Sequence, residues 1–256
     1  MSTYLPFLAD SRPCAGCRGP RGPICPVCRP AFQGEAYLVH RDALDLPVIA
    51  SAAYDGPVRE ALIAFKDHGR WSLRAPLGAS LAYSVNRLLA GRLDQGLGGR
   101  AVERRSDPPA PDLSAYRPVL AARRFLLVPV PSTGASLRAR DGNHVLELAE
   151  RVEERLVTWT EALPGLVVVR RRRDQVGLGR SARAANLHGS MRATDVLVRR
   201  AARPGTAVVL VDDIVTTGAS LAEAHRALTA AGIRPWGAAV VAATPDLPRR
   251  ARRGRS

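Results

Sequence analysis

Apolar residues along this chain occur in two alternating patterns, short unbroken runs and helically spaced sets. Unbroken runs stand at 125–131, 166–169, 208–211 and 237–243, and runs of this length are typical of parallel strands buried on both faces. Residues 35–55 fit further short strands and their connections. The pattern therefore predicts a sheet assembled from strands that lie far apart in the sequence.

Helically spaced apolar residues separate these predicted strands. Pro57 suits the first position of a helix that continues through VREALIAFKDHG to Gly69. Further helices are predicted at 73–90, at 144–156 and after Ser220. The alternation predicts an α/β fold, with a mostly parallel twisted sheet flanked by helices and ligand loops at the carboxyl ends of its strands.

Local composition divides the chain into five segments. The expected division is a cysteine-containing and hood segment at 1–50, a helical segment at 51–92, a Gly/Pro-rich linker at 93–118, a core domain at 119–246 and a basic tail at 247–256. The tail has five arginines in its last eight residues, so it is predicted to be disordered.

Composition and charge narrow the class of protein. The chain has 256 residues, 46% of them hydrophobic, which suffices for one α/β domain and a smaller module. No apolar run approaches the roughly 18 residues of a membrane span and no secretory leader is apparent, so a cytoplasmic protein without membrane insertion is expected. The net charge of +15 suggests a nucleic-acid partner, but Lys66 is the one lysine among 38 basic residues, which indicates a compositional preference for arginine.

All four cysteines fall in two pairs, Cys14-x-x-Cys17 and Cys25-x-x-Cys28. Two such knuckles can present four thiolates tetrahedrally to Zn²⁺, and the Gly and Pro residues between them suit tight turns. Two disulfides are the alternative, which a cytoplasmic location disfavours. A small zinc ribbon is predicted, with a structural role because the protein fills all four ligand positions.

Residues 208–220 combine a strand, two acids, a loop of small residues and a helix start. Val208 begins the apolar run, Asp212 and Asp213 follow it, and Gly218 allows the backbone to approach an anion closely. The first turn of the helix directs N–H groups and a positive dipole end at such an anion. The residues expected to hold a phosphate, here called the phosphate loop, are Thr216, Thr217, Gly218, Ala219 and Ser220.

The acid pair limits the kind of ligand that this motif can bind. Two carboxylates beside a phosphate must face another group, either a Mg²⁺ ion or the hydroxyls of a sugar that bears the phosphate. The Gly-Lys-Ser/Thr of a nucleotide-triphosphate loop is missing, as is the G-x-G-x-x-G of a dinucleotide loop. The alternative is an acidic surface turn with a threonine that caps the next helix.

Candidate functional residues also occur at three other sites in the sequence. Lys66 is singled out because a compact ammonium differs from the planar fork of arginine. The loop after 125–131 resembles the phosphate loop in composition and is predicted to bind pyrophosphate through Ser132, Thr133, Arg138 and Arg140. The basic, glycine-interrupted stretch after 166–169 is predicted to be a mobile flap over an anionic substrate, with Gln175, Arg183 and Asn186 as its functional members. Solvated surface positions are the alternative for all three.

Residues 208–220 resemble the phosphoribosyl-pyrophosphate (PRPP) signature of the type I phosphoribosyltransferases. This resemblance implies that Asp212 and Asp213 hold the ribose hydroxyls while the phosphate loop holds the 5-phosphate.

Nearly the whole chain resembles the ComF family of competence-associated phosphoribosyltransferase-like proteins. The shared features are the four-cysteine ribbon, the YDGPVREALIAFKDHG helix, VPVP followed by R-x-R and Asn143, the pattern from Gln175 to Asn186, and the phosphate loop. The family usually reads Arg-Gly-Phe-Asn-Gln where this chain has Arg-Asp-Gly-Asn-His at 140–144, and Asp141 adds a negative charge there.

The resemblance implies a type I phosphoribosyltransferase fold with an N-terminal zinc element. It also implies Mg²⁺-dependent transfer of a phosphoribosyl group from PRPP to an unknown acceptor, such as a nucleobase, with Asp212, Asp213, Arg183 and Lys66 as catalytic residues. The alternative is a non-catalytic component of DNA-uptake machinery that binds PRPP or single-stranded DNA and partners a DNA-translocating helicase.

Overall fold

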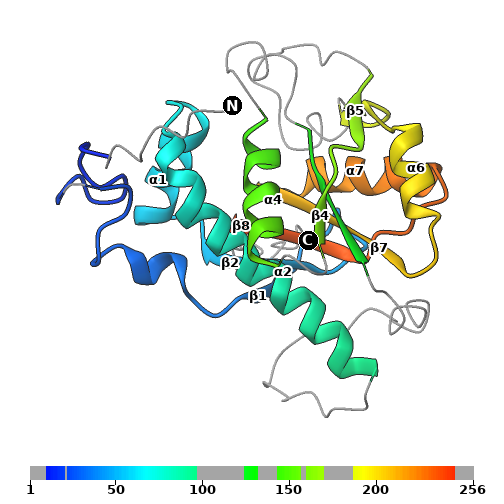
Figure 1. Ribbon diagram of the computed structural model, residues 1–256, viewed down its shortest axis with the longest axis horizontal. Coiled ribbons are helices and arrows are strands. Elements are labelled where there is room, and N and C mark those ends of the chain that lie inside the picture. Colours follow the sequence, from blue (N-terminus) through cyan, green and yellow to red (C-terminus); the bar gives the residue numbers. More distant parts are fainter. Residues whose placement is uncertain are drawn as a thin grey trace, which may run out of the picture.

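The computed structural model describes residues 10–20, 22–96, 124–131, 143–156, 160–169 and 187–245. Within them, the main sheet has six strands in the order β1-β2-β8-β7-β3-β4 (Figure 1). These are β1 (Tyr37–Val39), β2 (Val48–Ala53), β3 (Arg124–Pro129), β4 (Thr160–Ala162), β7 (Thr206–Val215) and β8 (Gly237–Ala243). The β1–β2 pair is antiparallel and the other pairs are parallel. The predicted α/β architecture with a mostly parallel sheet is confirmed.

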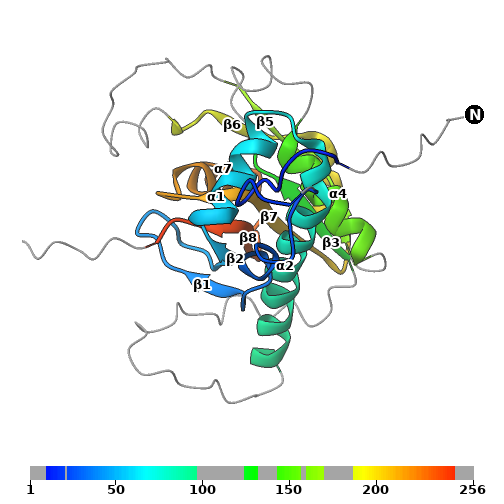
Figure 2. The ribbon, with the colours of Figure 1, turned by 90° about the vertical axis from the view of Figure 1, so that its left-hand side faces the viewer.

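Helices cover both faces of this sheet (Figures 1 and 2). The α-helices are α1 (Gly56–Lys66), α2 (Arg74–Gly96), α4 (His144–Arg155), α6 (Asp195–Ala201) and α7 (Ala219–Ala230), and two 3-10 turns are η1 (Arg29–Phe32) and η2 (Trp71–Leu73). No helix in the described part of the chain is long and apolar enough to cross a lipid bilayer.

The sheet divides the core into two layers because successive strand residues point to opposite faces. In β7, Val209 and Val211 pack with α1, α2 and α4, whereas Val208 and Leu210 pack with α6 and α7. Helix α2 approaches the sheet through small polar residues, and the Ser84 hydroxyl donates to the Val240 carbonyl at 2.7 Å. The central strands are therefore buried on both faces, which explains their unbroken apolar runs.

The predicted strand at 166–169 exists but does not belong to the main sheet. Leu166–Val168 forms β5, which pairs antiparallel with β6 (Met191–Ala193) in a separate two-stranded sheet. Val167 is exposed there. The strand beside β3 is β4, whose Thr-Glu-Ala sequence has no apolar run because it lies at the edge of the sheet and is only partly buried.

Neighbouring strands β3 and β7 lead to helices on opposite faces of the sheet. Helix α4, which follows β3 in the chain, packs in the layer of α1 and α2, whereas α7, which follows β7, packs in the other layer. Pairing between the two strands ends at Pro129 and Val211. Ligands of open α/β sheets bind at the carboxyl ends of strands whose connections diverge in this way. This end of β3 and β7 is therefore where a ligand is expected.

Candidate functional site

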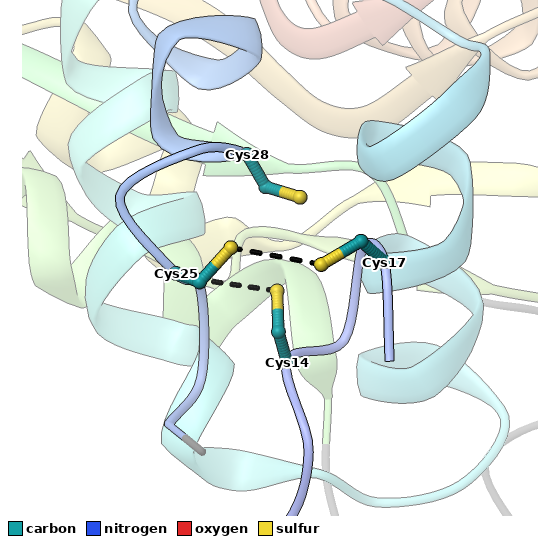
Figure 3. Close-up of side chains that lie close together, drawn as sticks. All are labelled: Cys14, Cys17, Cys25 and Cys28. Carbon is teal, nitrogen blue, oxygen red and sulfur yellow. Dashed lines mark hydrogen bonds between the residues drawn. The ribbon is translucent and has the colours of Figure 1, made fainter. Parts of the chain in front are cut away.

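The four cysteines form a cluster in which the sulfur atoms point toward one another (Figure 3). All four Sγ atoms lie within 4.8 Å of one another, and those of Cys17 and Cys25 are 3.6 Å apart. A tetrahedral zinc ion with Zn–S bonds of about 2.3 Å requires sulfur atoms about 3.8 Å apart. All four cysteines are free thiols rather than disulfides. The cluster therefore has the composition and spacing to bind a metal ion such as zinc.

Hydrogen bonds at Cys14 suit a metal-bound thiolate. The backbone N–H groups of Gly16 and Cys25 donate to its Sγ atom at 3.4 and 3.3 Å. Burial by itself raises the pKa of Cys14, but backbone donors lower that pKa overall to about 6. At Cys28, burial and the neighbouring sulfur atoms raise the pKa well above the usual range of a thiol. A cation among the sulfur atoms would favour the thiolate form of all four.

The cysteine segment contacts both ends of α1. At the helix start, Gly16 lies so close to Pro57 that an added Cβ atom would stand 2.7 Å from the Pro57 Cβ atom. Beyond the helix end, Arg70 donates from Nε to the Asp10 carboxylate at 2.8 Å and from Nη2 to the Gly22 carbonyl at 3.0 Å. Helix α1 is therefore fixed in place by the segment that carries the cysteines.

The acid pair lies inside β7 rather than beyond its end. Because β7 continues to Val215, Asp212 and Asp213 remain in the sheet, and Asp212 is in register with Val240 of β8. The two residues are only 8% and 3% exposed. The predicted strand end at residue 211 is therefore wrong, because β7 continues through both acids. Pairing with the buried strand β8 extends β7 past its apolar run.

Asp213 has two cationic or hydrogen-bonding partners from distant elements. Its Oδ2 atom lies 3.0 Å from Nζ of Lys66, at the end of α1, and 3.0 Å from Nε2 of His144, at the start of α4. Burial alone would raise the pKa of Asp213, but the His144 hydrogen bond and the Lys66 charge hold it well below the usual value. The carboxylate is therefore ionised at neutral pH.

The contact that lowers the pKa of Asp213 raises the pKa of Lys66. Its side chain is 34% exposed, and its burial alone would lower its pKa. The neighbouring charge of Asp213 outweighs that effect and raises the pKa of Lys66 above its usual value. The structure therefore joins Lys66 and Asp213, two of the predicted catalytic residues, in one ion pair.

The pKa of Asp212 is shifted in the opposite direction from that of Asp213. Its Oδ1 atom accepts a hydrogen bond from the Asp213 backbone N–H at 2.9 Å. Burial and the negative charge of Asp213 raise the pKa of Asp212 well above its usual value, although Lys66 opposes the shift. An added cation or a set of hydroxyl donors would favour its charged form. Asp212 is therefore the member of the pair whose charge a bound ligand can change.

The phosphate loop has the predicted position between a strand and a helix. Thr216 and Thr217 are exposed after the end of β7, and α7 begins at Ala219. Gly218 adopts a left-handed conformation with φ of 83°, which favours glycine. The Thr217 hydroxyl accepts a hydrogen bond from the Ala219 N–H at 3.4 Å. The loop therefore joins β7 to the positive end of the α7 dipole.

Two other predicted groups lie outside the described residues, and their roles stay predictions. They are the pyrophosphate-binding residues Ser132, Thr133, Arg138 and Arg140, and the flap residues Gln175, Arg183 and Asn186. For the first of these two groups, a described residue close to it in the sequence lies at the acid pair. His144 follows the first stretch in the sequence and contacts Asp213.

His144 is a site residue that the sequence reasoning missed. It is buried in the first turn of α4, and the Asn143 side chain caps this helix by accepting from the Leu146 N–H at 3.3 Å. A cap residue after a strand and a loop places the next residue near the carboxyl ends of the strands. That pattern was available in the sequence as Asn143-His144.

Compared with known proteins, the chain matches no family model and no curated protein. The functional argument therefore depends on the arrangement of this chain's own residues. The arrangement consists of a buried acid pair with built-in partners, a phosphate loop on the same strand, and a separate four-cysteine cluster.

Proposed function

We propose that this protein binds PRPP and transfers its phosphoribosyl group to an acceptor, with release of pyrophosphate. The observation that carries the proposal is the joint position of Asp212, Asp213 and the phosphate loop at the carboxyl end of β7. Connections from β3 and β7 diverge there, so the place suits a ligand. In this proposal the fold is that of a type I phosphoribosyltransferase with an N-terminal zinc ribbon, as in the ComF family.

A sugar phosphate needs two kinds of partner, and this strand end carries both. The N–H groups of the phosphate loop and the start of α7 suit the 5-phosphate. The Asp212 carboxylate suits the ribose hydroxyls, because hydrogen bonds to a charged acceptor are stronger than neutral ones. Asp213 would act as a positioning residue, since its own carboxylate is already held by Lys66 and His144.

The reaction breaks the bond between C1 of the ribose and the pyrophosphate oxygen, and both electrons of that bond leave with the pyrophosphate. An acceptor nucleophile then forms the new bond to C1 from the opposite face. Positive charge develops on the ribose, so a nearby ionised carboxylate stabilises it, while cationic side chains stabilise the leaving group. Asp212 and Asp213 lie in β7 a few residues before the phosphate loop, so in this proposal they supply that negative charge.

Mg²⁺ is expected to bind together with PRPP and to neutralise the charge of the pyrophosphate. The chemistry of the donors fits this ion, because a buried pair of neighbouring carboxylates, one with a raised pKa, favours an added cation. The cysteine cluster would hold a zinc ion, and because its four sulfur ligands would leave no open position, the role of that ion would be structural.

Calorimetric titration of PRPP, with and without Mg²⁺, tests the binding step. A screen of nucleobases for pyrophosphate release then tests the transfer step. We expect saturable PRPP binding and release of pyrophosphate with at least one acceptor. Failure to bind PRPP at millimolar concentration would overturn the proposal.

A non-catalytic role in DNA uptake is the second candidate, and the net charge of +15 is the observation that favours it. Such a protein would bind PRPP or single-stranded DNA and would release no pyrophosphate with any acceptor. Binding to a labelled oligonucleotide at 50 and 200 mM salt, beside the acceptor screen, distinguishes the two candidates.

A further inference from the structure

The loop between β1 and β2, residues 40–47, lies directly against the phosphate loop. It is far from that loop in the sequence, yet the two share side-chain contacts at Thr216 and Gly218. Leu46 of the β1–β2 loop is buried in the core layer of α7, which anchors the loop to that side of the sheet. The residues of the β1–β2 loop that contact the phosphate loop are Arg41 and Leu44.

Arg41 donates hydrogen bonds to backbone carbonyl groups at the ends of two strands. Its Nε atom lies 2.6 Å from the carbonyl oxygen of Thr216, and its Nη2 atom donates to the carbonyl oxygen of Thr244 after β8. Its Nη1 atom donates to the His40 carbonyl at 2.7 Å. Each nitrogen of the guanidinium therefore has a carbonyl partner, and the planar group joins the phosphate loop to the end of β8.

Leu44 fills the space beside Gly218. A Cβ atom added to Gly218 would stand 2.8 Å from Cδ1 and 2.9 Å from Cγ of Leu44. Gly218 has φ of 83°, so its conformation and its contact both require glycine. The leucine side chain thus lies against the residue at which the backbone turns into α7.

We propose that the β1–β2 loop holds the phosphate loop in the conformation that receives a 5-phosphate, with Arg41 and Leu44 as positioning residues. This inference rests on the proposed function. Across a trans peptide the carbonyl and the next N–H point in opposite directions, so the bond from Arg41 to the Thr216 carbonyl directs the Thr217 N–H away from Arg41. A loop fixed before the ligand arrives loses less conformational entropy on binding.

The first test measures the loop without any ligand. In Arg41→Lys the charge stays, but a single ammonium cannot reproduce the planar fork that reaches both strand ends. Hydrogen exchange of the amides at 216–220 should become about tenfold faster in Arg41→Lys and in Leu44→Ala, as loss of one hydrogen bond or one packing contact predicts. Arg87→Lys, at an exposed position of α2, is the matched control and should leave this exchange unchanged. Unchanged exchange in both variants would overturn the inference.

The second test measures affinity for ribose 5-phosphate and for pyrophosphate by calorimetry. Both variants should bind ribose 5-phosphate on the order of tenfold more weakly than the parent, with pyrophosphate binding unchanged. Faster exchange with unaltered ribose 5-phosphate affinity would also overturn the inference. If the parent binds neither ribose 5-phosphate nor PRPP, the proposed function fails, and the exchange experiment alone then decides whether Arg41 and Leu44 hold the loop.

Discussion

The cysteine cluster and the acid pair are both groups of buried titratable side chains, but they balance their charges in different ways. In the described part of the chain the hydrogen-bond partners of the four sulfur atoms are backbone N–H groups and one another, so as thiolates they depend on a bound metal ion. Asp213, in contrast, has Lys66 and His144 at 3.0 Å within the protein. A site that must stay rigid can depend on a permanent ion, whereas a site that binds and releases a ligand needs countercharges of its own. The first region should therefore fail without metal, and the second should stay folded without ligand.

Removal of the metal should have the largest effect on stability. We expect one zinc ion per chain by elemental analysis, and Cys25→Ser should abolish it. The melting temperature should then fall by about 10 °C or more, because structural zinc contributes on the order of 10 kcal/mol in isolated fingers and each kcal/mol changes the melting temperature of a domain this size by about 2–4 °C.

The parent after treatment with a chelator is the control for this experiment and should resemble the variant. A parent that is purified without metal, with four titratable thiols and an unaltered melting temperature, would contradict the prediction and remove the contrast between the two regions.

Loss of Lys66 should have an intermediate effect. In Lys66→Met the buried Asp213 carboxylate loses a cation, and this should cost about 2 kcal/mol of unfolding free energy, less than for a fully buried pair because Lys66 is 34% exposed. Lys66→Arg keeps the charge and should recover part of the loss. Denaturant unfolding measures both.

The pH dependence of this loss has a defined sign. The pKa of Asp213 is lowered in the folded protein, so its stabilisation exists above the ordinary aspartate pKa and is lost as the pH falls. The pKa of Lys66 is raised, so its share exists below the ordinary lysine pKa and is lost as the pH rises. The difference between parent and Lys66→Met should be greatest between about pH 5 and 9. A difference independent of pH would show that the lost contact was packing.

The smallest expected effect on stability is that of Asp212→Asn, and it should differ from the effect of Asp213→Asn. Asp212→Asn should leave the unfolding free energy within about 1 kcal/mol of the parent or raise it, because burial and Asp213 disfavour the Asp212 charge. PRPP affinity should nevertheless fall by roughly ten- to a hundredfold. Asp213→Asn is the matched variant and should lose stability, since it removes the partner of Lys66 and His144. Equal PRPP affinity in the parent and Asp212→Asn would contradict the proposed role of Asp212.

Features that depend on local residue spacing could be predicted from the sequence, whereas contacts between distant residues could not. The cysteine cluster follows from two Cys-x-x-Cys pairs, since each knuckle fixes its own ligands and one short loop joins them. The strand, loop and helix around Gly218 were also predictable, because apolar runs and glycine act locally. Lys66 stands out as the one lysine of the chain, but nothing in the sequence indicates that it contacts Asp213.

The errors arose where tertiary pairing overrode local polarity. The acidic residues of β7 suggested a strand end, yet pairing with β8 keeps them in the sheet, where Lys66 and His144 hold the Asp213 carboxylate. The polar strand β4 was missed because an edge needs few apolar residues. Arg41 gave no local signal at all, since its partners Thr216 and Thr244 are distant in the sequence.

The position of β8 has a consequence for how the chain acquires its structure during synthesis. β8 is the last of the described strands to be made, yet it lies between β2 and β7, with Val48 in register with Ala238 and Val209 in register with Gly237. A ribosome must therefore release nearly all of this sheet's sequence before β2 can pair with β8. Until then β2 and β7 each present an unpaired apolar edge, which is the feature that chaperones bind and that aggregation exploits.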